Sequence, residues 1–174
     1  MTSLAWGKKV SQTFRDRVFW IAEDLELDAS DLMACMAFES GGTFRADIRN
    51  AAGSGAVGLI QFMPQTALML GTTSEQLAAM SAEDQLNYVW KYLSPQKGRL
   101  NNLGDIYLSI LWPAGIGKSD DWVLFAAGGA RPKLYLQNKG LDTDHDGAVT
   151  RGETIAKVKA KLAEGMKPAN LWTD

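Results

Sequence analysis

The stretch Gly55-Ala56-Val57-Gly58-Leu59-Ile60-Gln61-Phe62-Met63-Pro64-Gln65-Thr66-Ala67 carries the most informative pattern of the 174-residue chain. Residues 40–58, which run into it, are rich in glycine, serine, alanine and asparagine, a composition typical of a loop. Pro64 suits the first position of a helix, where no backbone N–H is needed, and Gly71 suits its end after Leu70. The stretch is therefore predicted to be a loop that leads into a short helix.

Helical periodicity dominates on both sides of this loop. Apolar residues between Phe14 and Leu25 recur on one helical face. Asp28 is a suitable N-cap for a second, very apolar helix, which Gly41-Gly42 ends just after Glu39. Strand signals are weak, so the fold class is predicted to be mostly α. We expect helices over residues 14–25, 29–39, 64–70, 74–80, 82–94, 104–112 and 150–165.

Composition narrows the class of protein further. Apolar residues make up 46% and charged residues 22%, close to the average of a globular domain. The net charge of −2 argues against a nucleic-acid binder, and the sequence has no apolar run long enough to insert into a membrane. We expect one domain over residues 1–174, with a catalytic core at about 10–130. Residues 142–153 and a helix over 151–165 are expected to pack on it as an appendage.

Residues 142–153 (Asp-Thr-Asp-His-Asp-Gly-Ala-Val-Thr-Arg-Gly-Glu) match the EF-hand calcium loop. Ca²⁺ takes about six to eight oxygen ligands, and Gly147 at position 6 lets the chain curl so that the carboxylates converge. A single loop favours one structural ion over a calcium sensor. The alternative is an acidic, solvated turn that caps a helix. The expected ligands are the side chains of Asp142, Asp144, Asp146, Thr150 and Glu153 and the backbone carbonyl of Ala148.

Glu39 ends the apolar segment Leu32–Glu39 (LMACMAFE). A carboxyl group in such a place is partly buried, and burial raises its pKa. The negative potential at the C-terminal end of a helix acts in the same direction. A carboxyl group that is protonated near neutral pH is what a general acid requires. The alternative is an ordinary solvated or capping glutamate.

Three segments together resemble the lytic transglycosylases of the lysozyme superfamily, of the soluble-transglycosylase type. Phe38-Glu39-Ser40 is similar to the Glu-Ser motif that holds this family's only catalytic acid. Residues 55–67 are similar to its Gly-Ala-x-Gly-Leu-Met-Gln…Met-Pro-x-Thr-Ala stretch, and residues 110–117 to its Ala-Tyr-Asn-Ala-Gly-x-Gly. Tyr92-Leu93 resembles the Tyr-Leu of its central helix. The resemblance implies a lysozyme-like (goose-type lysozyme/transglycosylase) fold with a cleft for peptidoglycan glycan strands.

The resemblance also implies a reaction, cleavage of the β-1,4 bond between N-acetylmuramic acid and N-acetylglucosamine. Glu39 would act first as acid on the glycosidic oxygen and then as base on the sugar's own C6 hydroxyl. The product is a 1,6-anhydro sugar, formed without water and without a catalytic cofactor. Ordinary glycosidases use two carboxylates, whereas residues 48–74 contain none.

Two alternatives stay open. Asp47 is the nearest second carboxylate after Glu39, so a hydrolytic muramidase in which Asp47 activates water is the runner-up enzyme. From a different class, the chain is an inactive glycan-binding or calcium-stabilised structural module. A monomer is the default oligomeric state.

The family pattern further implies substrate-binding roles for Gln61 and Met63, with Ser54 near the family's serine. The Gln61 amide offers a donor and an acceptor to sugar groups, and the alternative is an amide bonded to the loop backbone. The third segment departs from the family because Trp112 stands where a tyrosine is usual. Trp112 can stack on a sugar but lacks a hydroxyl group, which Tyr107 is a candidate to supply. The alternatives are a Trp112 packed under the cleft and a Tyr107 in the core.

The N-terminal residues MTSLAWGKKVSQ lack the apolar stretch of a secretory signal. We therefore expect a phage lysis enzyme or virion component that is made in the host cytoplasm. It would reach the cell wall through a holin-type pore or with the virion.

Overall fold

Helices make up most of the structure, a computed structural model that describes residues 2–174. Two short antiparallel sheets accompany them: β1 (Ser3–Leu4) pairs with β4 (Trp172–Thr173), and β2 (Val123–Ala126) pairs with β3 (Ala148–Thr150). The helices are α1 (Gln12–Leu25), α2 (Ala29–Glu39), α3 (Pro64–Met69), α4 (Ser74–Ala79), α5 (Ala82–Leu93), α6 (Leu103–Leu111), α7 (Pro132–Asn138) and α8 (Arg151–Gly165).

The prediction of a mostly helical chain is confirmed, and each expected helix is present within two residues of its expected ends. The caps explain this agreement, because Ser11, Asp28, Thr73, Ser81 and Thr150 each accept a hydrogen bond from a backbone N–H in the first turn of the following helix. Helix α7 and the β2–β3 pair were not predicted. Both are short, and neither carries a strong local pattern.

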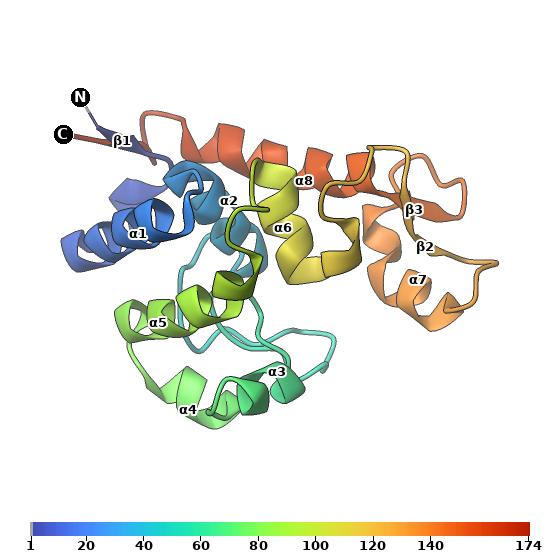
Figure 1. Cartoon of the computed structure of the whole chain (residues 1–174), viewed down its shortest axis with the longest axis horizontal. Coiled ribbons are helices and arrows are strands. Elements are labelled where there is room, and N and C mark those ends of the chain that lie inside the picture. The colour runs from blue at the N-terminus through green and yellow to red at the C-terminus, as the bar shows by residue number, and fades with distance from the viewer. Residues whose placement is uncertain (1) are drawn as a thin grey trace.

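Helix α2 lies at the centre of the molecule and positions Glu39 at its end. Every residue from Leu32 to Ala37 is buried, as expected for a helix that is apolar all round. Helix α2 packs against α1, α6 and α8, and α1 packs against α5 (Figure 1). The carboxyl end of α2 is therefore held from several sides.

A buried glutamine holds the loop between α2 and α3 in place. The Oε1 atom of Gln85 on α5 accepts a hydrogen bond from the Leu59 amide at 2.7 Å, and its Nε2 atom donates to the Ala46 carbonyl at 3.0 Å. Gly58 has a φ of 85°, and a Cβ atom there would overlap the Gln85 amide. Only glycine combines this conformation with this close approach.

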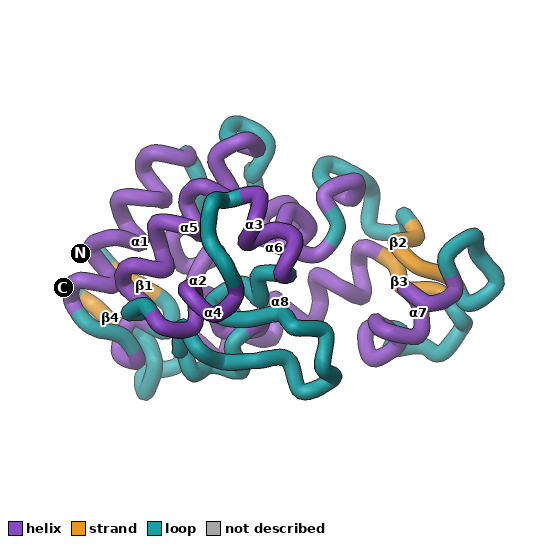
Figure 2. The backbone as a smooth tube through the Cα atoms, turned by 90° about the horizontal axis from the view of Figure 1, so that it is seen from below, coloured by secondary structure: helices purple, strands orange, loops and turns teal. Residues whose placement is uncertain are grey.

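Helix α8 belongs to the main body, which differs from the appendage we expected. It packs against both α2 and α6, because Thr154, Ile155 and Val158 form a buried face. At its start, the buried Arg151 guanidinium pairs with the buried Asp105 on α6 at 2.9 Å. Figures 1 and 2 show α8 running along the molecule, from the end where the termini meet to the end that holds β2, β3 and α7.

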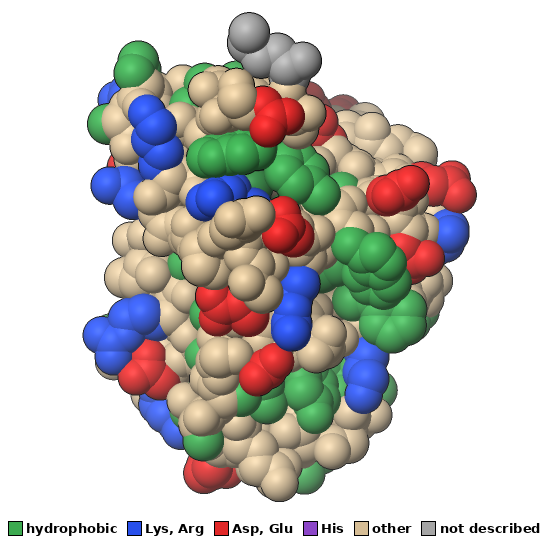
Figure 3. Space-filling view, turned by 90° about the vertical axis from the view of Figure 1, so that its left-hand side faces the viewer, with side chains coloured by type: hydrophobic (Ala, Val, Ile, Leu, Met, Phe, Trp, Pro, Cys, Tyr) green, Lys and Arg blue, Asp and Glu red, His purple; other side chains and the backbone are tan. Residues whose placement is uncertain are grey.

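The surface carries no dominant charge on the face that holds the termini. Figure 3 shows Lys and Arg side chains interspersed there with Asp, Glu and apolar side chains. Within residues 2–174, no helix combines the length and the apolar character needed to cross a membrane.

Candidate active site and acidic loop

Glu39 is the half-buried last residue of α2. Its carboxyl group is surrounded by protein atoms, and this desolvation raises its pKa from 4.5 to about 7. A hydrogen bond from the Tyr107 hydroxyl acts in the opposite direction and limits the rise. A pKa close to neutral pH suits a group that donates a proton and then takes one back.

Two tyrosines from different helices lie around this carboxyl group. Tyr107 on α6 is 2% exposed, and its ring meets Phe38 edge to face with centroids 5.3 Å apart. Tyr92 on α5 donates a hydrogen bond to the Ser109 carbonyl at 2.6 Å. Desolvation raises the pKa of both tyrosines, and the nearby Glu39 charge raises it further. Both hydroxyl groups therefore stay protonated near Glu39, with the Tyr92 proton donated to the Ser109 carbonyl and the Tyr107 proton to Glu39.

Tyr107 was expected to supply a hydroxyl group, and the structure places it in the core and against Glu39 at once. Tyr92 was not among the expected site residues. The sequence pattern at this position is the Tyr92-Leu93 pair, which resembles the Tyr-Leu of the family's central helix. This pattern does not indicate where the Tyr92 hydroxyl group lies. Its proximity to Glu39 follows from the packing of α5, α6 and α2 and is not visible in the local sequence.

Asp47, the candidate for a second carboxylate, is exposed and engaged elsewhere. Both of its carboxylate oxygens accept hydrogen bonds from the Arg45 guanidinium, at 2.9 and 2.8 Å. This contact lowers the pKa of Asp47. Asp47 is not among the groups that shift the pKa of Glu39. The Asp47 carboxylate is therefore held in an exposed ion pair with Arg45.

The expected substrate residues of the loop have different surroundings. Gln61 has a φ of 54°, and its amide nitrogen donates to the Ile48 and Gly58 carbonyls at 3.1 and 3.0 Å. The Gln61 side chain is thus bonded to the backbone of its own loop through its nitrogen, and its Oε1 atom accepts no hydrogen bond within residues 2–174. Met63 is 47% exposed at the start of α3. The exposed Ser54 accepts a hydrogen bond from the Ala56 amide within its own turn.

Trp112 lies directly after α6 and packs against the β2 end of the molecule. Its ring meets Phe125 edge to face with centroids 5.4 Å apart, and the Arg131 guanidinium lies 5.4 Å from the ring centroid. These side chains line a cavity of about 370 Å³ together with residues of β2 and α7. The residue that replaces the family's tyrosine is thus half-buried in an aromatic contact, as the alternative of a packed tryptophan described.

The acidic loop brings three carboxylates together. Oxygens of Asp142, Asp144 and Asp146 all lie within 4.8 Å of one another. Gly147 has a φ of 89°, which confirms that the loop bends at this glycine. Val149 pairs with Phe125 in the β2–β3 ladder, so the exit of the loop is pinned to a strand.

The loop also contains an orphaned buried oxygen. Asp142 is 3% exposed, and its Oδ2 atom accepts hydrogen bonds from the Tyr135 hydroxyl at 2.7 Å and the Gly147 amide at 3.1 Å. Its Oδ1 atom has no hydrogen-bond partner within residues 2–174. A buried carboxylate oxygen without a donor is costly. A cation bound beside Asp144 and Asp146 would supply the missing partner, so the loop fits Ca²⁺.

Two of the remaining expected ligands, Thr150 and Glu153, serve the start of α8 in this structure. The Glu153 and Thr150 side chains form a capping box, with the Glu153 carboxylate also accepting hydrogen bonds from Thr143. Although desolvation opposes it, these hydrogen bonds lower the pKa of Glu153 to about 2. Ala148 lies in β3 opposite Ala126. The structure thus gathers three of the expected ligands and leaves Glu153 as a helix cap.

Comparison with known families supplies an independent finding. A family model described as "Transglycosylase SLT domain" matches residues 18–125, which is more than half of the chain. The match includes Glu39, Tyr92, Tyr107 and Trp112 and ends before the acidic loop. Comparison with curated proteins gives no match.

Proposed function

The chain belongs to the transglycosylase SLT domain family, and from this premise we propose that it cleaves peptidoglycan with Glu39 as its only general acid and base. Membership supports a lytic transglycosylase of the lysozyme-like superfamily that acts on peptidoglycan. The observation that carries the finer mechanism is the half-buried Glu39 carboxyl group, whose pKa of about 7 suits both proton transfers.

The proposed reaction moves one proton out and one proton back. Glu39 donates its proton to the glycosidic oxygen as the bond from that oxygen to C1 of N-acetylmuramic acid breaks. The C6 hydroxyl oxygen of the same sugar then bonds to C1, and its proton passes to Glu39. The products are an N-acetylglucosamine end and a 1,6-anhydro-N-acetylmuramic acid end, and no water is consumed.

The surroundings of Glu39 support this sequence of steps. Tyr107 is placed to donate to the Glu39 carboxylate once that carboxylate has lost its proton, which stabilises the ionised form. Asp47 is held by Arg45 in an exposed position, so nothing observed favours it as a water-activating base. The single-carboxylate route therefore fits the site better than the two-carboxylate route.

Mass spectrometry of the fragments released from purified peptidoglycan tests the proposal directly. We expect fragments that are one water lighter than hydrolysis products and resist borohydride reduction. Glu39→Gln should lower fragment release by orders of magnitude while the far-UV circular dichroism spectrum is retained. Reducible fragments of the hydrated mass would show a muramidase instead. A Glu39→Gln protein that degrades peptidoglycan normally would contradict the assignment of Glu39.

We further propose that residues 142–153 bind one structural Ca²⁺ ion. Asp142, Asp144 and Asp146 would supply carboxylate ligands, and the ion would satisfy the buried Asp142 Oδ1 atom. Glu153, Thr150 and the Ala148 carbonyl are the further proposed ligands. To bind the ion, the Glu153 carboxylate would release the hydrogen bonds that it accepts from Thr143. The ion would tie the start of α8 to the β2–β3 pair.

Thermal unfolding with calcium or a chelator tests this second proposal. An ion at about 100 times its Kd stabilises the folded state by roughly 2.7 kcal/mol, which corresponds to a Tm rise of about 5–10 °C for a chain of this size. Asp142→Ala should abolish the rise, whereas Asp16→Ala, which removes an exposed carboxylate on α1, should retain it. Equal melting temperatures in calcium and in chelator would contradict a stabilising site.

A further inference from the structure

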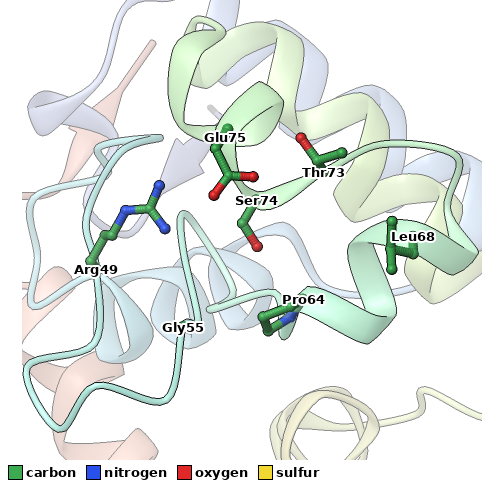
Figure 4. Close-up of a pocket in the computed structure, with 7 residues that line it drawn as sticks. All are labelled: Arg49, Gly55, Pro64, Leu68, Thr73, Ser74 and Glu75. Atoms are coloured by element: carbon green, nitrogen blue, oxygen red, sulfur yellow. The ribbon is translucent and has the colours of Figure 1, made fainter.

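A small hollow lies between the loop that precedes α3, α3 itself and the start of α4. It has a volume of about 270 Å³ and is lined by Arg49, Gly55, Pro64, Leu68, Thr73, Ser74 and Glu75. Figure 4 shows Arg49 on one side and Glu75 and Ser74 on the other, with their polar groups directed toward the space between them. The hollow is smaller than a typical drug-sized site, so it suits a group no larger than an amino acid.

Arg49 differs from the other arginines of the chain. The exposed Arg49 has no ion pair and no aromatic ring under its guanidinium group within residues 2–174. The other arginines each have a carboxylate, an amide oxygen, a backbone carbonyl or an aromatic ring as a partner: Arg15, Arg17, Arg45, Arg99, Arg131 and Arg151. The Arg49 guanidinium is thus free to bind a planar anionic group from outside the chain.

Two polar groups face Arg49 without partners of their own. Ser74 is 7% exposed, and its Oγ atom is buried without a hydrogen-bond partner among the described residues. Glu75 is exposed and forms no ion pair within residues 2–174, with Arg49 or with any other cation. A buried hydroxyl group without a partner is uncommon and points to a ligand atom that completes it.

The charges around the hollow select the ligand. A simple anion would be attracted by Arg49 and repelled by Glu75. A simple cation would be attracted by Glu75 and repelled by Arg49. A group with a carboxylate and an ammonium on one carbon atom satisfies both and leaves a carboxylate oxygen for the Ser74 hydroxyl. Leu68 and Pro64 provide an apolar wall for its carbon chain.

We propose that this hollow binds the zwitterionic end of an amino acid, with Arg49 and Ser74 on its carboxylate and Glu75 on its ammonium. The identity of the ligand rests on the proposed function. Peptidoglycan stem peptides can contain diaminopimelate, whose side chain ends in a free amino and carboxylate pair, and we assign this pair to the hollow. The hollow would then recognise the peptide while the site at Glu39 cleaves the glycan to which the peptide is attached.

The two sites are connected through the loop between them. Gly55 and Pro64 both line the hollow, and they stand at the two ends of the segment that contains Phe62. The Phe62 ring meets Tyr92 edge to face with centroids 6.3 Å apart, and Tyr92 lies near Glu39. A ligand in the hollow therefore lies against the same segment that packs beside the candidate active site.

Cleavage of two substrates that differ only in their peptides tests the proposal. One is glycan bearing diaminopimelate-type stem peptides, and the other is the same glycan after an amidase has removed the peptides. The wild-type protein should have a higher kcat/KM on the first. Arg49→Gln and Glu75→Gln should each lower that preference by up to about fivefold, the value of an exposed charge contact, and leave cleavage of bare glycan unchanged.

Matched controls separate this effect from a general change of charge. Arg99→Gln and Glu23→Gln remove the same charges from exposed positions outside the hollow, and both should keep the preference for peptide-bearing glycan. Equal kcat/KM of the wild-type protein on the two substrates would overturn the proposal.

Direct binding keeps the test independent of catalysis. Free stem tetrapeptide that contains diaminopimelate should shift the amide NMR signals of Ser74 and Glu75 in the wild-type protein. The lysine-containing tetrapeptide, which lacks the carboxylate of the zwitterion, should bind several-fold more weakly. Binding without cleavage of any glycan would refute the proposed function and retain the peptide site, whereas cleavage without discrimination between the peptides would refute the peptide site alone.

Discussion

Replacing Glu39 with glutamine is expected to stabilise the protein at pH 8 and to leave its stability at pH 4 nearly unchanged. The reason is that burial raises the pKa of Glu39 to about 7 in the folded state, from 4.5 for an unperturbed glutamate. The unfolded chain therefore loses this proton at a lower pH than the folded chain. The contribution of Glu39 to stability is therefore fully present below pH 4.5, where this group is protonated in both states, and is lost as the pH rises to about 7.

The size of the effect follows from the same two values. One pKa unit corresponds to about 1.4 kcal/mol, so a rise from 4.5 to about 7 costs roughly 3 kcal/mol of unfolding free energy above pH 7. Glutamine is nearly isosteric with protonated glutamate and carries no charge at any pH. The glutamine variant therefore does not lose this stability, and the unfolding free energies of the two proteins should diverge between pH 4.5 and pH 7.

Urea denaturation followed by tryptophan fluorescence measures this difference at pH 4 and at pH 8. Glu23→Gln is the control, because Glu23 is exposed on α1 and its substitution should not create a pH-dependent difference. A Glu39→Gln variant with the same stability change at both pH values would refute the reasoning. It would mean that the carboxyl group is solvated and that its proton is not held by the fold.

Three further predictions follow from named contacts. Tyr107→Phe removes the hydrogen bond that lowers the pKa of Glu39, so the alkaline fall of activity, expected near pH 7, should move to higher pH in a pH profile of kcat/KM. Asp47→Asn should change peptidoglycan cleavage less than twofold, and a large loss would favour the hydrolytic mechanism. Arg151→Met leaves the buried Asp105 carboxylate without its charged partner and should lower the unfolding free energy by about 3–5 kcal/mol, measured by urea denaturation. A loss smaller than about 1 kcal/mol would show that water replaces the guanidinium group.

The helices and the position of Glu39 were predictable because their signals are local. Helix caps, apolar spacing and glycine stops act within a few residues, and Glu39 stands at the end of a very apolar helix. The bend at Gly147 was predictable for the same reason, since the loop motif places its glycine by position. The raised pKa of Glu39 was expected in direction from its apolar neighbours.

Contacts between distant segments were beyond the reach of such signals. The sequence gives no sign that Gln85 differs from other polar residues of α5. It is nevertheless fully buried, and its side chain accepts a hydrogen bond from the Leu59 amide in the loop. The resemblance predicts that Gln61 binds substrate, yet its amide nitrogen donates hydrogen bonds to backbone carbonyls of its own loop. The role of each amide depends on which backbone groups the fold leaves without a partner.

The sequence by itself determined the helical class, the family motifs and the single carboxyl group at the end of α2, because periodicity, caps and motif spacing are properties of neighbouring residues. Only the tertiary structure decided that Tyr92 and Tyr107 surround that carboxyl group, that α8 is part of the core, and that Arg49 faces Glu75 across a hollow. These arrangements arise from packing between elements far apart in the chain, where burial and charge are set by side chains that no local pattern brings together.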